Sequence, residues 1–412
     1  MWYLSVAATR ARFGAGIGLG WALGVWLPLW VYAGAGADAQ TRAVLAYDTS
    51  RGGGAYGPSM AVDPCFGYYR KVPLAELARR IRQHGFTCVH LVDYGAEGSR
   101  PEELQRFAAA FRAEGLSPVL CIYPGTHSRL YRQHPEWRQR MLTGIEGKCD
   151  WRTWLCPNRP DFVSAYCEHV RQQMLTGGFD GVQLAEIWFE NWGGPLRDGK
   201  PNPHYACVCD ACLERFRKMA GTEVNAREML TDSKSRWYFK KPENAALYAR
   251  WVEMRVQTIQ DFGQAIIHTV RAIQSNACVK IMYMADARVE LNGGREYLGN
   301  DLDRMVKEWQ PDVLTFEDAW QDWLHGNLAT GFVADYARAY KTRVEKLRPG
   351  LFLMSHADIG SRPESKRSVE WIRKFAAETV RAGFGAPAFY EWHVSRLAEE
   401  DPPPPSPPSQ SR

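Results

Sequence analysis

Short apolar segments alternate with amphipathic helical patterns along most of the chain, and this alternation is the strongest constraint on its fold. Strands that alternate with helices pair in parallel through right-handed crossovers. Eight such strands close a (β/α)8 barrel, so the sequence predicts a TIM barrel with enlarged βα loops. The eight apolar segments with the length of buried strands are 43–48, 87–94, 118–123, 179–188, 279–284, 312–317, 351–356 and 386–392. The helical patterns between them are 74–83, 101–114, 161–175, 245–274, 302–308, 333–347 and 369–381.

A doubly wound open sheet is the structural alternative. Such a sheet usually carries a Gly-rich phosphate-binding loop after its first strand. The Gly-rich stretch 47–57 lacks the Gly-x-Gly-x-x-Gly spacing, and no helical pattern follows it at once. We therefore exclude a nucleotide site there, and no organic cofactor is expected.

The N-terminus has the pattern of an export signal. Arg10 and Arg12 precede an apolar run, 13–36, that contains no acidic residue, and Ala37-Asp38-Ala39 fits a small-x-small cleavage site. We expect residues 1–39 to be a signal peptide, or an uncleaved membrane anchor, because the run is long enough to span a bilayer. In either case the rest of the chain faces outward, secreted or in the periplasm.

The other end is rich in proline. Residues 399–412 cannot bury apolar area and are expected to form a disordered tail, which leaves 40–398 for a catalytic barrel.

Composition narrows the class of ligand. The net charge of +5 is spread along the sequence without a basic stripe, so no nucleic-acid partner is expected. The 16 Trp, 18 Tyr and 17 Phe suit a sugar-binding cleft, although a bulky core explains the same counts.

Acids and aromatic residues collect where the predicted strands end, which is where a (β/α)8 barrel places its chemistry. Aromatic rings there are expected to stack on sugars, and two histidines to hydrogen-bond hydroxyl groups. These candidate substrate-binding residues are Tyr94, Trp188, Trp192, Trp320, Trp392, His356 and His393.

Glu186 ends the fourth predicted strand. Strand alternation places Val182, Leu184 and Glu186 on one face, which we expect to line the barrel. The indoles that follow Glu186 would desolvate its carboxyl group. We interpret Glu186 as a catalytic carboxylate, the alternative being a solvated loop acid. Glu190, beyond the strand end, is expected to be solvated.

Glycoside cleavage needs a second carboxylate, about 5 Å away for retention of configuration and about 6.5–9.5 Å away for inversion. Candidates at other strand ends are, in order of preference, Glu317, Asp358, Glu391 and Asp318. Alternation favours Glu317 over Asp318. Each of these acids would also suit helix capping or the shaping of a pocket.

Cys207, Cys209 and Cys212 form a C-x-C-x-x-C cluster that is too tight for three separate disulfides. Thiolates on one short loop before a helix fit a tetrahedral zinc site, with Cys156 as the preferred fourth ligand and Cys149 as the second choice. Such a zinc would be structural. In an exported protein, a disulfide between two of these cysteines is the alternative.

Residues 134–218 carry a family resemblance, through "HPEW", "LCPNRPDF", "FDGVQLAEIWFENWGG" and "CVCDACLERFRK". The segment is similar to the central part of the (β/α)8 glycoside hydrolases of family 42, the β-galactosidases, and to related bacterial glycoside-hydrolase-like proteins. The resemblance implies that Glu186 is the general acid/base, and that a structural zinc is held by Cys156, Cys207, Cys209 and Cys212.

The sequence departs from that family at two points. The family has Asn before the acid/base glutamate, where this chain has Ala185. The family's nucleophile is a Glu at the end of strand seven, where this chain offers His356 and Asp358. Both departures weaken the inference of β-galactosidase activity more than the inference of fold.

These observations predict an exported retaining glycosidase acting on a poly- or oligosaccharide, with Glu186 as acid/base and Glu317 or Asp358 as nucleophile. A non-catalytic carbohydrate-binding protein on the same barrel is the first alternative. Metal-dependent hydrolysis through His356, Asp358 and His393 is the second. Membrane contact is expected only through an uncleaved anchor, and the sequence does not set the oligomeric state.

Overall fold

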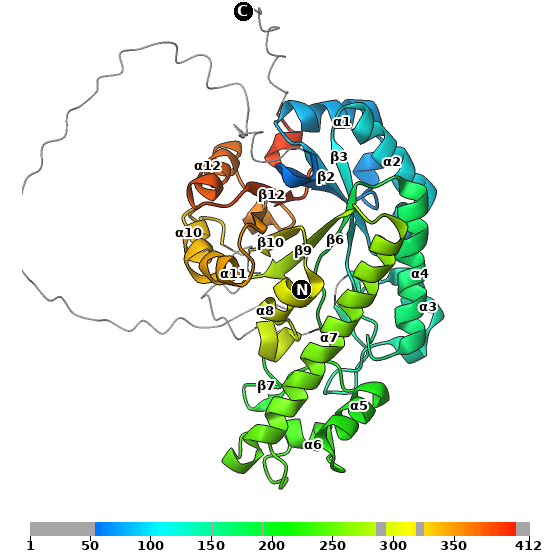
Figure 1. The fold of residues 1–412 in the computed structure, drawn as a ribbon, viewed down its shortest axis with the longest axis vertical. Coiled ribbons are helices and arrows are strands. Elements are labelled where there is room, and N and C mark those ends of the chain that lie inside the picture. The colour runs from blue at the N-terminus through cyan, green and yellow to red at the C-terminus, as the bar shows by residue number, and fades with distance from the viewer. Residues whose placement is uncertain (1–53, 150, 191–192, 286–293, 319–324, 401–412) are drawn as a thin grey trace, which may run out of the picture. The chain divides into compact units, whose positions relative to one another are not determined.

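The structure, a computed structural model, describes residues 54–400 except for 150, 191–192, 286–293 and 319–324. Its centre is a closed barrel of parallel strands in the order β1-β12-β11-β10-β9-β6-β3-β2 (Figure 1). The barrel strands are β1 (Ser59–Val62), β2 (Cys88–Asp93), β3 (Ser117–Ile122), β6 (Gly181–Leu184), β9 (Cys278–Met284), β10 (Val313–Glu317), β11 (Phe352–Asp358) and β12 (Ala386–Tyr390). The closed barrel confirms the predicted (β/α)8 class and excludes the open sheet.

The first strand is not the predicted one. β1, four residues long and buried throughout, closes the barrel by pairing with both β2 and β12. The predicted segment 43–48 lies outside the described residues and is not needed for closure, so that prediction is wrong. β1 is too short to stand out as an apolar run. β6 also differs, because it ends at Leu184, four residues before the predicted end.

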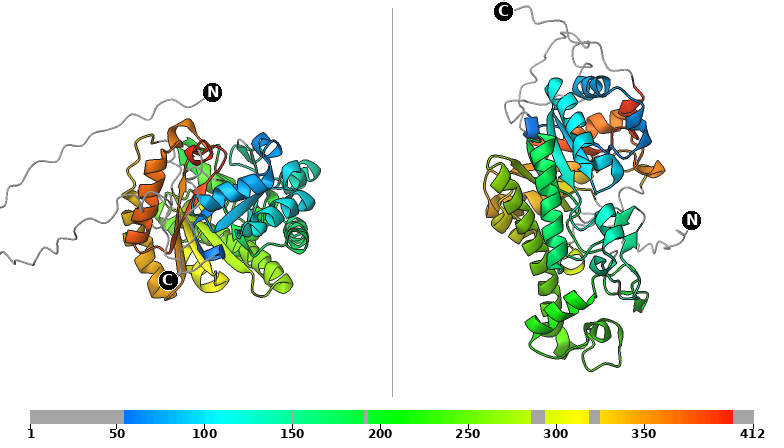
Figure 2. Two further views of the ribbon diagram at one scale, coloured as in Figure 1. Left: turned by 90° about the horizontal axis from the view of Figure 1, so that it is seen from above. Right: turned by 90° about the vertical axis from the view of Figure 1, so that its right-hand side faces the viewer.

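Helices surround the barrel, as the view from above shows (Figure 2). The amphipathic patterns explain their positions: α1, for example, turns Leu77, Ala78 and Ile81 inward and its charged residues outward. The helices are α1 (Leu74–Gln83), α2 (Pro101–Ala113), α3 (Ser128–Gln133), α4 (Pro160–Gly177), α5 (Asp210–Ala220), α6 (Ala226–Thr231), α7 (Ala245–Ile273), α8 (Leu302–Arg304), α10 (Phe332–Tyr336), α11 (Thr342–Leu347) and α12 (Val369–Arg381). The described residues also contain three π-helical segments. Gly294–Leu298 precedes α8, Met305–Trp309 follows α8, and Ala337–Lys341 joins α10 to α11.

Strand alternation separates two cores. Leu314 and Phe316 of β10 belong to the large core between strands and helices. Val313 packs instead with residues of other strands, such as Met354, inside the barrel. Glu317 follows Val313 and Thr315 on the inward face, so the predicted orientation of β10 is confirmed.

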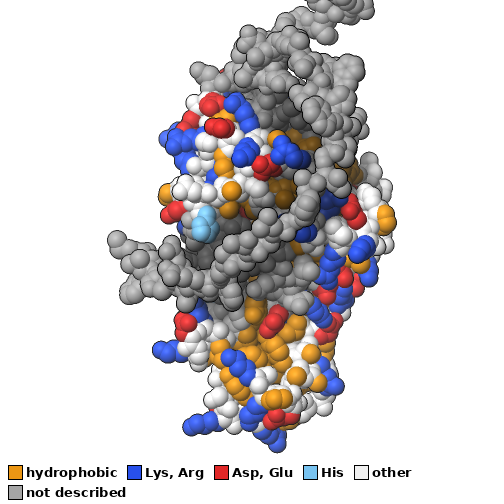
Figure 3. Space-filling model, turned by 90° about the vertical axis from the view of Figure 1, so that its left-hand side faces the viewer, with side chains coloured by type: hydrophobic (Ala, Val, Ile, Leu, Met, Phe, Trp, Pro, Cys, Tyr) orange, Lys and Arg blue, Asp and Glu red, His pale blue; other side chains and the backbone are white. Residues whose placement is uncertain are grey.

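Two βα connections are enlarged, as predicted. The connection between β3 and α4 contains α3 and the hairpin of β4 (Lys148–Cys149) and β5 (Arg152–Thr153). The connection between β6 and α7 contains the hairpin of β7 (Leu196–Arg197) and β8 (Lys200–Pro201), then α5 and α6. Its helices form a second small core with the first turns of α7, which includes Phe216, Met229 and Trp251. On the face drawn in Figure 3, hydrophobic side chains gather low in the view, at the level of α5 and α6.

No helix within the described residues is both long and apolar enough to cross a lipid bilayer. The N-terminal apolar run and the Pro-rich end from residue 401 lie outside those residues, so the export signal and the tail stay predictions.

Candidate active site

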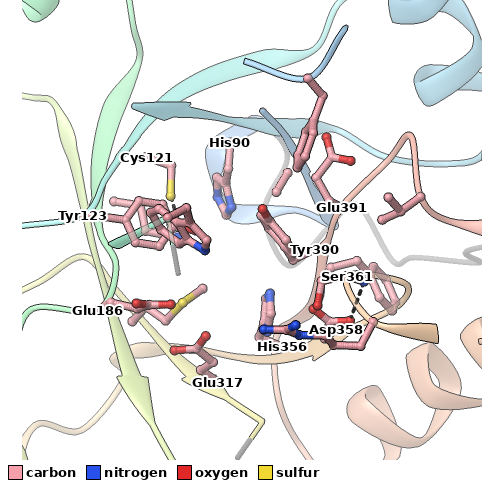
Figure 4. Close-up of a pocket in the computed structure, with 18 of the residues that line it drawn as sticks. His90, Cys121, Tyr123, Glu186, Glu317, His356, Asp358, Ser361, Tyr390 and Glu391 are labelled. Atoms are coloured by element: carbon pink, nitrogen blue, oxygen red, sulfur yellow. Dashed lines mark hydrogen bonds between the residues drawn. The ribbon is translucent and has the colours of Figure 1, made fainter. Parts of the chain in front are cut away.

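A cavity of about 260 Å³ lies at the carboxyl ends of the barrel strands (Figure 4). Every strand of the barrel contributes a side chain to its lining. Going round the barrel in chain order, these include Ala61, His90, Cys121, Gln183, Met282, Glu317, His356 and Tyr390. This is the place where a (β/α)8 barrel carries its active site.

Glu186 lines this cavity, but not through the predicted alternation. Val182 and Leu184 point outward into the large core, whereas Gln183 lines the cavity. Glu186 reaches the cavity because β6 has already ended and the backbone at Glu186 turns, with φ at +48°. A non-glycine residue in this left-handed region is uncommon and is often held at functional sites.

Arg152 forms a bidentate ion pair with Glu186. Arg152 Nε is 2.6 Å from Glu186 Oε2, and Nη2 is 2.5 Å from Oε1. Both side chains are nearly fully buried. Burial by itself would lower the pKa of Arg152, but the Glu186 carboxylate outweighs it and raises that pKa. The ion pair therefore stabilises a negative charge on Glu186.

Glu317 lines the same cavity, but its surroundings disfavour a negative charge on its carboxyl group. Burial raises the pKa of Glu317 well above its ordinary value, and the charges of Glu186 and Asp318 raise it further. Its Oε2 is buried and has no hydrogen-bond partner among the described residues. Figure 4 shows Glu186 and Glu317 pointing into the same side of the cavity. The site thus holds one carboxylate in an ion pair and one carboxyl group whose pKa is raised by burial and by neighbouring charges.

Asp358 is a weaker candidate for the second carboxylate. It lines the cavity, but its Oδ1 accepts hydrogen bonds from the backbone N–H groups of Gly360 and Ser361 and from the hydroxyl of Ser365. Burial and the Asp318 charge raise its pKa. The carboxyl group of Asp358 therefore fixes the loop that follows β11.

His356 lines the cavity next to these acids, and Asp318 orients it. His356 Nδ1 is 2.9 Å from Asp318 Oδ1, and Asp318 also accepts the backbone N–H of Asp358. Asp318 is itself buried behind the lining. Its place behind the lining agrees with the preference for Glu317 over Asp318.

Glu391 also lines the cavity and is fully buried, but its oxygens are occupied. They accept the Tyr69 hydroxyl, the His393 ring N–H, and the backbone N–H groups of Asp63 and His393. This arrangement suits a positioning role better than nucleophilic attack. Asp63, which donates its backbone N–H to Glu391, was not among the predicted residues. Burial raises the pKa of Asp63 to about 7, and the charge of Glu391 contributes to this rise.

Aromatic rings flank the cavity, but only in part the predicted ones. Trp151 lines it, with Tyr123 and the predicted Tyr94 packed against the indole at centroid distances of 5.3 and 5.0 Å. Phe66 also lines the cavity, and the predicted His393 packs on this ring at 4.1 Å. Tyr94 and His393 therefore support lining rings.

Two predicted tryptophans face elsewhere. Trp392 lies beyond the end of β12 at Tyr390 and is fully buried in the large core, against His84 and Arg80, so its predicted contact with a sugar is wrong. Trp188 is 5% exposed and is not part of the described cavity lining. Trp192 and Trp320 lie outside the described residues.

Other lining residues gave no usable sequence signal. Arg152 and Trp151 belong to an irregular connection between strand and helix, and no spacing rule links Arg152 to Glu186, 34 residues away. Glu190 was also misread: it is buried, with His204 Nδ1 3.7 Å from its Oε1. It lies on the folded connection after β6 rather than in solvent.

The four predicted cysteines form a buried cluster that could bind a metal. The Sγ atoms of Cys156, Cys207, Cys209 and Cys212 all lie within 4.8 Å of one another. Cys156 Sγ is 3.4 Å from both Cys209 and Cys212, too far for a disulfide of about 2.05 Å. A tetrahedral zinc with bonds of about 2.3 Å places its sulfur ligands about 3.8 Å apart, which these positions suit.

Groups around the cluster also suit thiolate ligands. Asn158 Nδ2 is 3.2 Å from Cys212 Sγ, and the backbone N–H of Arg140 points to Cys207 Sγ. The cluster joins Cys156, in the segment that leads into α4, to the N-terminus of α5, and so it ties the two enlarged connections together.

The alternative metal site receives no such support. Among the described residues, the group of side chains able to hold a metal is the cysteine cluster. His356 and His393 are instead bound to Asp318 and Glu391, respectively.

Several solved structures of β-galactosidases have a fold similar to that of this chain. The β-galactosidase from Marinomonas ef1 matches with a TM-score of 0.56 and 11% identity, over 82% of this chain and 54% of its own. The β-galactosidase from Bacillus circulans sp. alkalophilus matches with a TM-score of 0.57 and 12% identity, over 81% and 50%. A GH42 β-galactosidase from G. stearothermophilus matches with a TM-score of 0.56 and 14% identity, over 82% and 51%.

This chain therefore spans about half the length of these proteins. No protein-family model matches the sequence, and no curated protein is similar to it. At these identities the likeness establishes the fold: the chain has the (β/α)8 barrel found in family 42 β-galactosidases.

Proposed function

We propose that this protein is a glycoside hydrolase that cleaves a poly- or oligosaccharide through Glu186 and Glu317. The observation that carries the proposal is the pair of buried carboxyl groups at the barrel mouth, one in an ion pair with Arg152 and the other with a pKa raised by burial. Glycosidases need one carboxylate and one carboxylic acid on either side of the scissile bond. Flanking rings such as Trp151 and Phe66 suit sugar stacking.

The charge states support a division of labour that reverses the one implied by the family resemblance. Arg152 stabilises the charge on Glu186, which suits a nucleophile, whereas Glu317 carries the proton that a leaving oxygen needs. Both carboxyl groups line the same cavity, and on this basis the mechanism we propose is the two-carboxylate retaining one. His356, held by Asp318, would hydrogen-bond a sugar hydroxyl.

Turnover of p-nitrophenyl glycosides tests the proposal. We expect hydrolysis of at least one member of a panel of common sugars, with the β-galactoside included because of the fold relatives. ¹H NMR of the first-formed sugar should show the anomeric configuration of the substrate. A product of inverted configuration would contradict the retaining mechanism, and an inactive protein across the panel and natural oligosaccharides would contradict the hydrolase proposal.

The pH dependence of kcat/KM provides a separate prediction. The active form needs a charged Glu186 and a protonated Glu317, so activity should fall as pH rises through the raised pKa of Glu317. Asp318→Asn removes a nearby charge that raises this pKa and keeps an oxygen for His356 Nδ1. We expect the alkaline limb of the profile to move to lower pH in this variant. An unmoved limb would mean that another group sets it.

A non-catalytic carbohydrate-binding protein is the second candidate function. The bidentate pair of Arg152 with Glu186 favours it, because a glutamate neutralised in this way can be purely structural. Ala185 before Glu186 points in the same direction. Saturable binding of a sugar by calorimetry, without turnover, would identify this function.

Two further features complete the proposal. The cysteine cluster would hold a structural zinc, which supplies rigidity to the two enlarged connections rather than a reactive position. The apolar segment 13–36 would direct the protein out of the cytoplasm, to a secreted or periplasmic location.

A further inference from the structure

A buried lysine lies beneath the cavity. Lys280, on β9, is fully buried, and its Nζ is 3.1 Å from His90 Nε2 and 3.6 Å from Cys88 Sγ, both on β2. Because β3 and β6 separate β2 from β9 in the barrel, these contacts cross its interior. Among the described residues, Lys280 has no carboxylate partner.

This contact fixes the hydrogen on the His90 ring. An ammonium group has only donors, so a charged Lys280 donates to Nε2 and requires this nitrogen to be the unprotonated one. Nδ1 then carries the hydrogen. Burial lowers the pKa of His90 well below its ordinary value, and Lys280 and His356 lower it further. His90 is therefore a neutral ring of one defined tautomer.

The Nδ1 donor is available to a ligand. His90 lines the cavity although it is only 2% exposed, and Nδ1 has no hydrogen-bond partner in the part of the chain that the structure describes. Figure 4 shows the ring pointing into the cavity from β2, toward the side that holds His356 and Glu317. Because His90 lines the cavity, an oxygen of a bound ligand can accept the hydrogen of Nδ1.

We propose that His90 is a substrate-binding residue at the floor of the cavity, that its Nδ1–H donates to an oxygen of the bound sugar, and that Lys280 is its positioning residue. The identity of the ligand as a carbohydrate rests on the proposed function. A hydroxyl group suits this place because it accepts from His90 while it donates to a neighbouring acceptor. The floor would then select sugars by the presence of a hydroxyl group at one ring position.

The tautomer is measured by long-range ¹H–¹⁵N NMR on protein labelled with ¹⁵N-histidine, with His90→Gln used for assignment. We expect a neutral His90 ring with the hydrogen on Nδ1 at pH 7. Lys280→Met, an apolar side chain of similar length, should lose this preference, because it offers no donor to Nε2. A hydrogen on Nε2, or a doubly protonated ring, in the wild-type protein would overturn the proposal.

Ligand contact is measured by titrating the same sample with methyl glycosides of galactose, glucose, mannose, xylose and fucose. One of them should shift the His90 signals and bind about tenfold more weakly to His90→Gln, which keeps the acceptor for Lys280 but loses the Nδ1–H. His90→Asn, which places an amide N–H near Nδ1, should recover part of the affinity. A monodeoxy analogue lacking the contacted hydroxyl should bind wild type and His90→Gln equally.

If none of these sugars shifts the His90 signals, the proposed contact is wrong. Binding with these signatures but without turnover would contradict the hydrolase function and leave the role of His90 intact.

Discussion

Glu186→Ala is expected to lower kcat by ~10⁴-fold or more for every glycoside, the scale seen when a catalytic nucleophile is removed. Glu317→Ala should behave differently. It should cost ~10²–10⁴-fold in kcat/KM for substrates with a poor leaving group, because the protonated Glu317 is the donor to the leaving oxygen. For a 2,4-dinitrophenyl glycoside, whose leaving group needs no proton, the loss in kcat/KM should be within about tenfold.

Azide rescue separates the two roles by stereochemistry. In Glu186→Ala, azide can occupy the space beside Arg152 and attack the anomeric carbon directly, which gives a glycosyl azide of inverted configuration. In Glu317→Ala, Glu186 still forms the glycosyl-enzyme, and azide attacks it from the other side, which gives a retained configuration. The opposite pair of products would show that Glu186 is the acid/base, as the family resemblance implies, and would overturn the assignment made from the charge states.

The matched control is Glu190→Gln, another buried glutamate on the connection after β6 but outside the described cavity lining. Glu186→Ala leaves Arg152 buried without its partner, so some loss of stability is expected. Melting temperatures of all three variants show whether a loss of rate reflects chemistry or unfolding. Comparable loss of activity in folded Glu190→Gln would contradict a specific role for Glu186.

The fold could be predicted because the periodic pattern of apolar residues indicates most of its helices and strands. Helix α1 and the apolar strands β2, β3 and β9 to β12 follow local patterns that the eye can read from the sequence. The first strand could not be found in the same way, since β1 has only four residues and no contrast with its surroundings. It is defined by pairing with β2 and β12, a tertiary property.

The direction of a side chain could be predicted for residues within a strand, where alternation sets it, but not for residues beyond the end of a strand. Glu317 lies where alternation along β10 places it. Glu186 reaches the cavity although Val182 and Leu184 point the other way, because its backbone turns at φ of +48°. Trp392 fails for a similar reason: β12 ends at Tyr390, and beyond this end Glu391 lines the cavity while Trp392 packs into the large core.

Partners supplied by irregular connections were beyond prediction. Arg152 pairs with Glu186, yet it belongs to β5, a two-residue strand of a hairpin whose position no periodic pattern describes. The cysteine cluster was predictable in spite of such loops, because three of its members are fixed by local spacing. A cluster of closely spaced reactive residues can therefore be predicted even in a loop, whereas a pair of residues far apart in the sequence cannot.

Replacing Cys212 by Ser, or stripping metal from the protein, is expected to destabilise it severely. Structural zinc contributes about 10–16 kcal/mol of apparent binding free energy in zinc-finger peptides, and whole domains are stable by only about 5–15 kcal/mol. Here the cluster ties the connection before α4 to the start of α5, so its loss should release both enlarged connections. Metal analysis should find one zinc per chain in the wild-type protein, and thermal melting should show the destabilisation.

Cys167→Ser is the matched control, because Cys167 is a free, half-buried cysteine outside the cluster, and its replacement should leave zinc content and melting unchanged. Activity alone is a poor readout, since Arg152 lies on one of the tied connections and would move when the cluster opens. Loss of the ion pair between Arg152 and Glu186 would then abolish turnover although no metal takes part in the reaction. Metal-free wild-type protein that melts like the zinc-bound form, with Cys212→Ser equally stable, would instead identify the cluster as four buried thiols whose packing alone supports the fold.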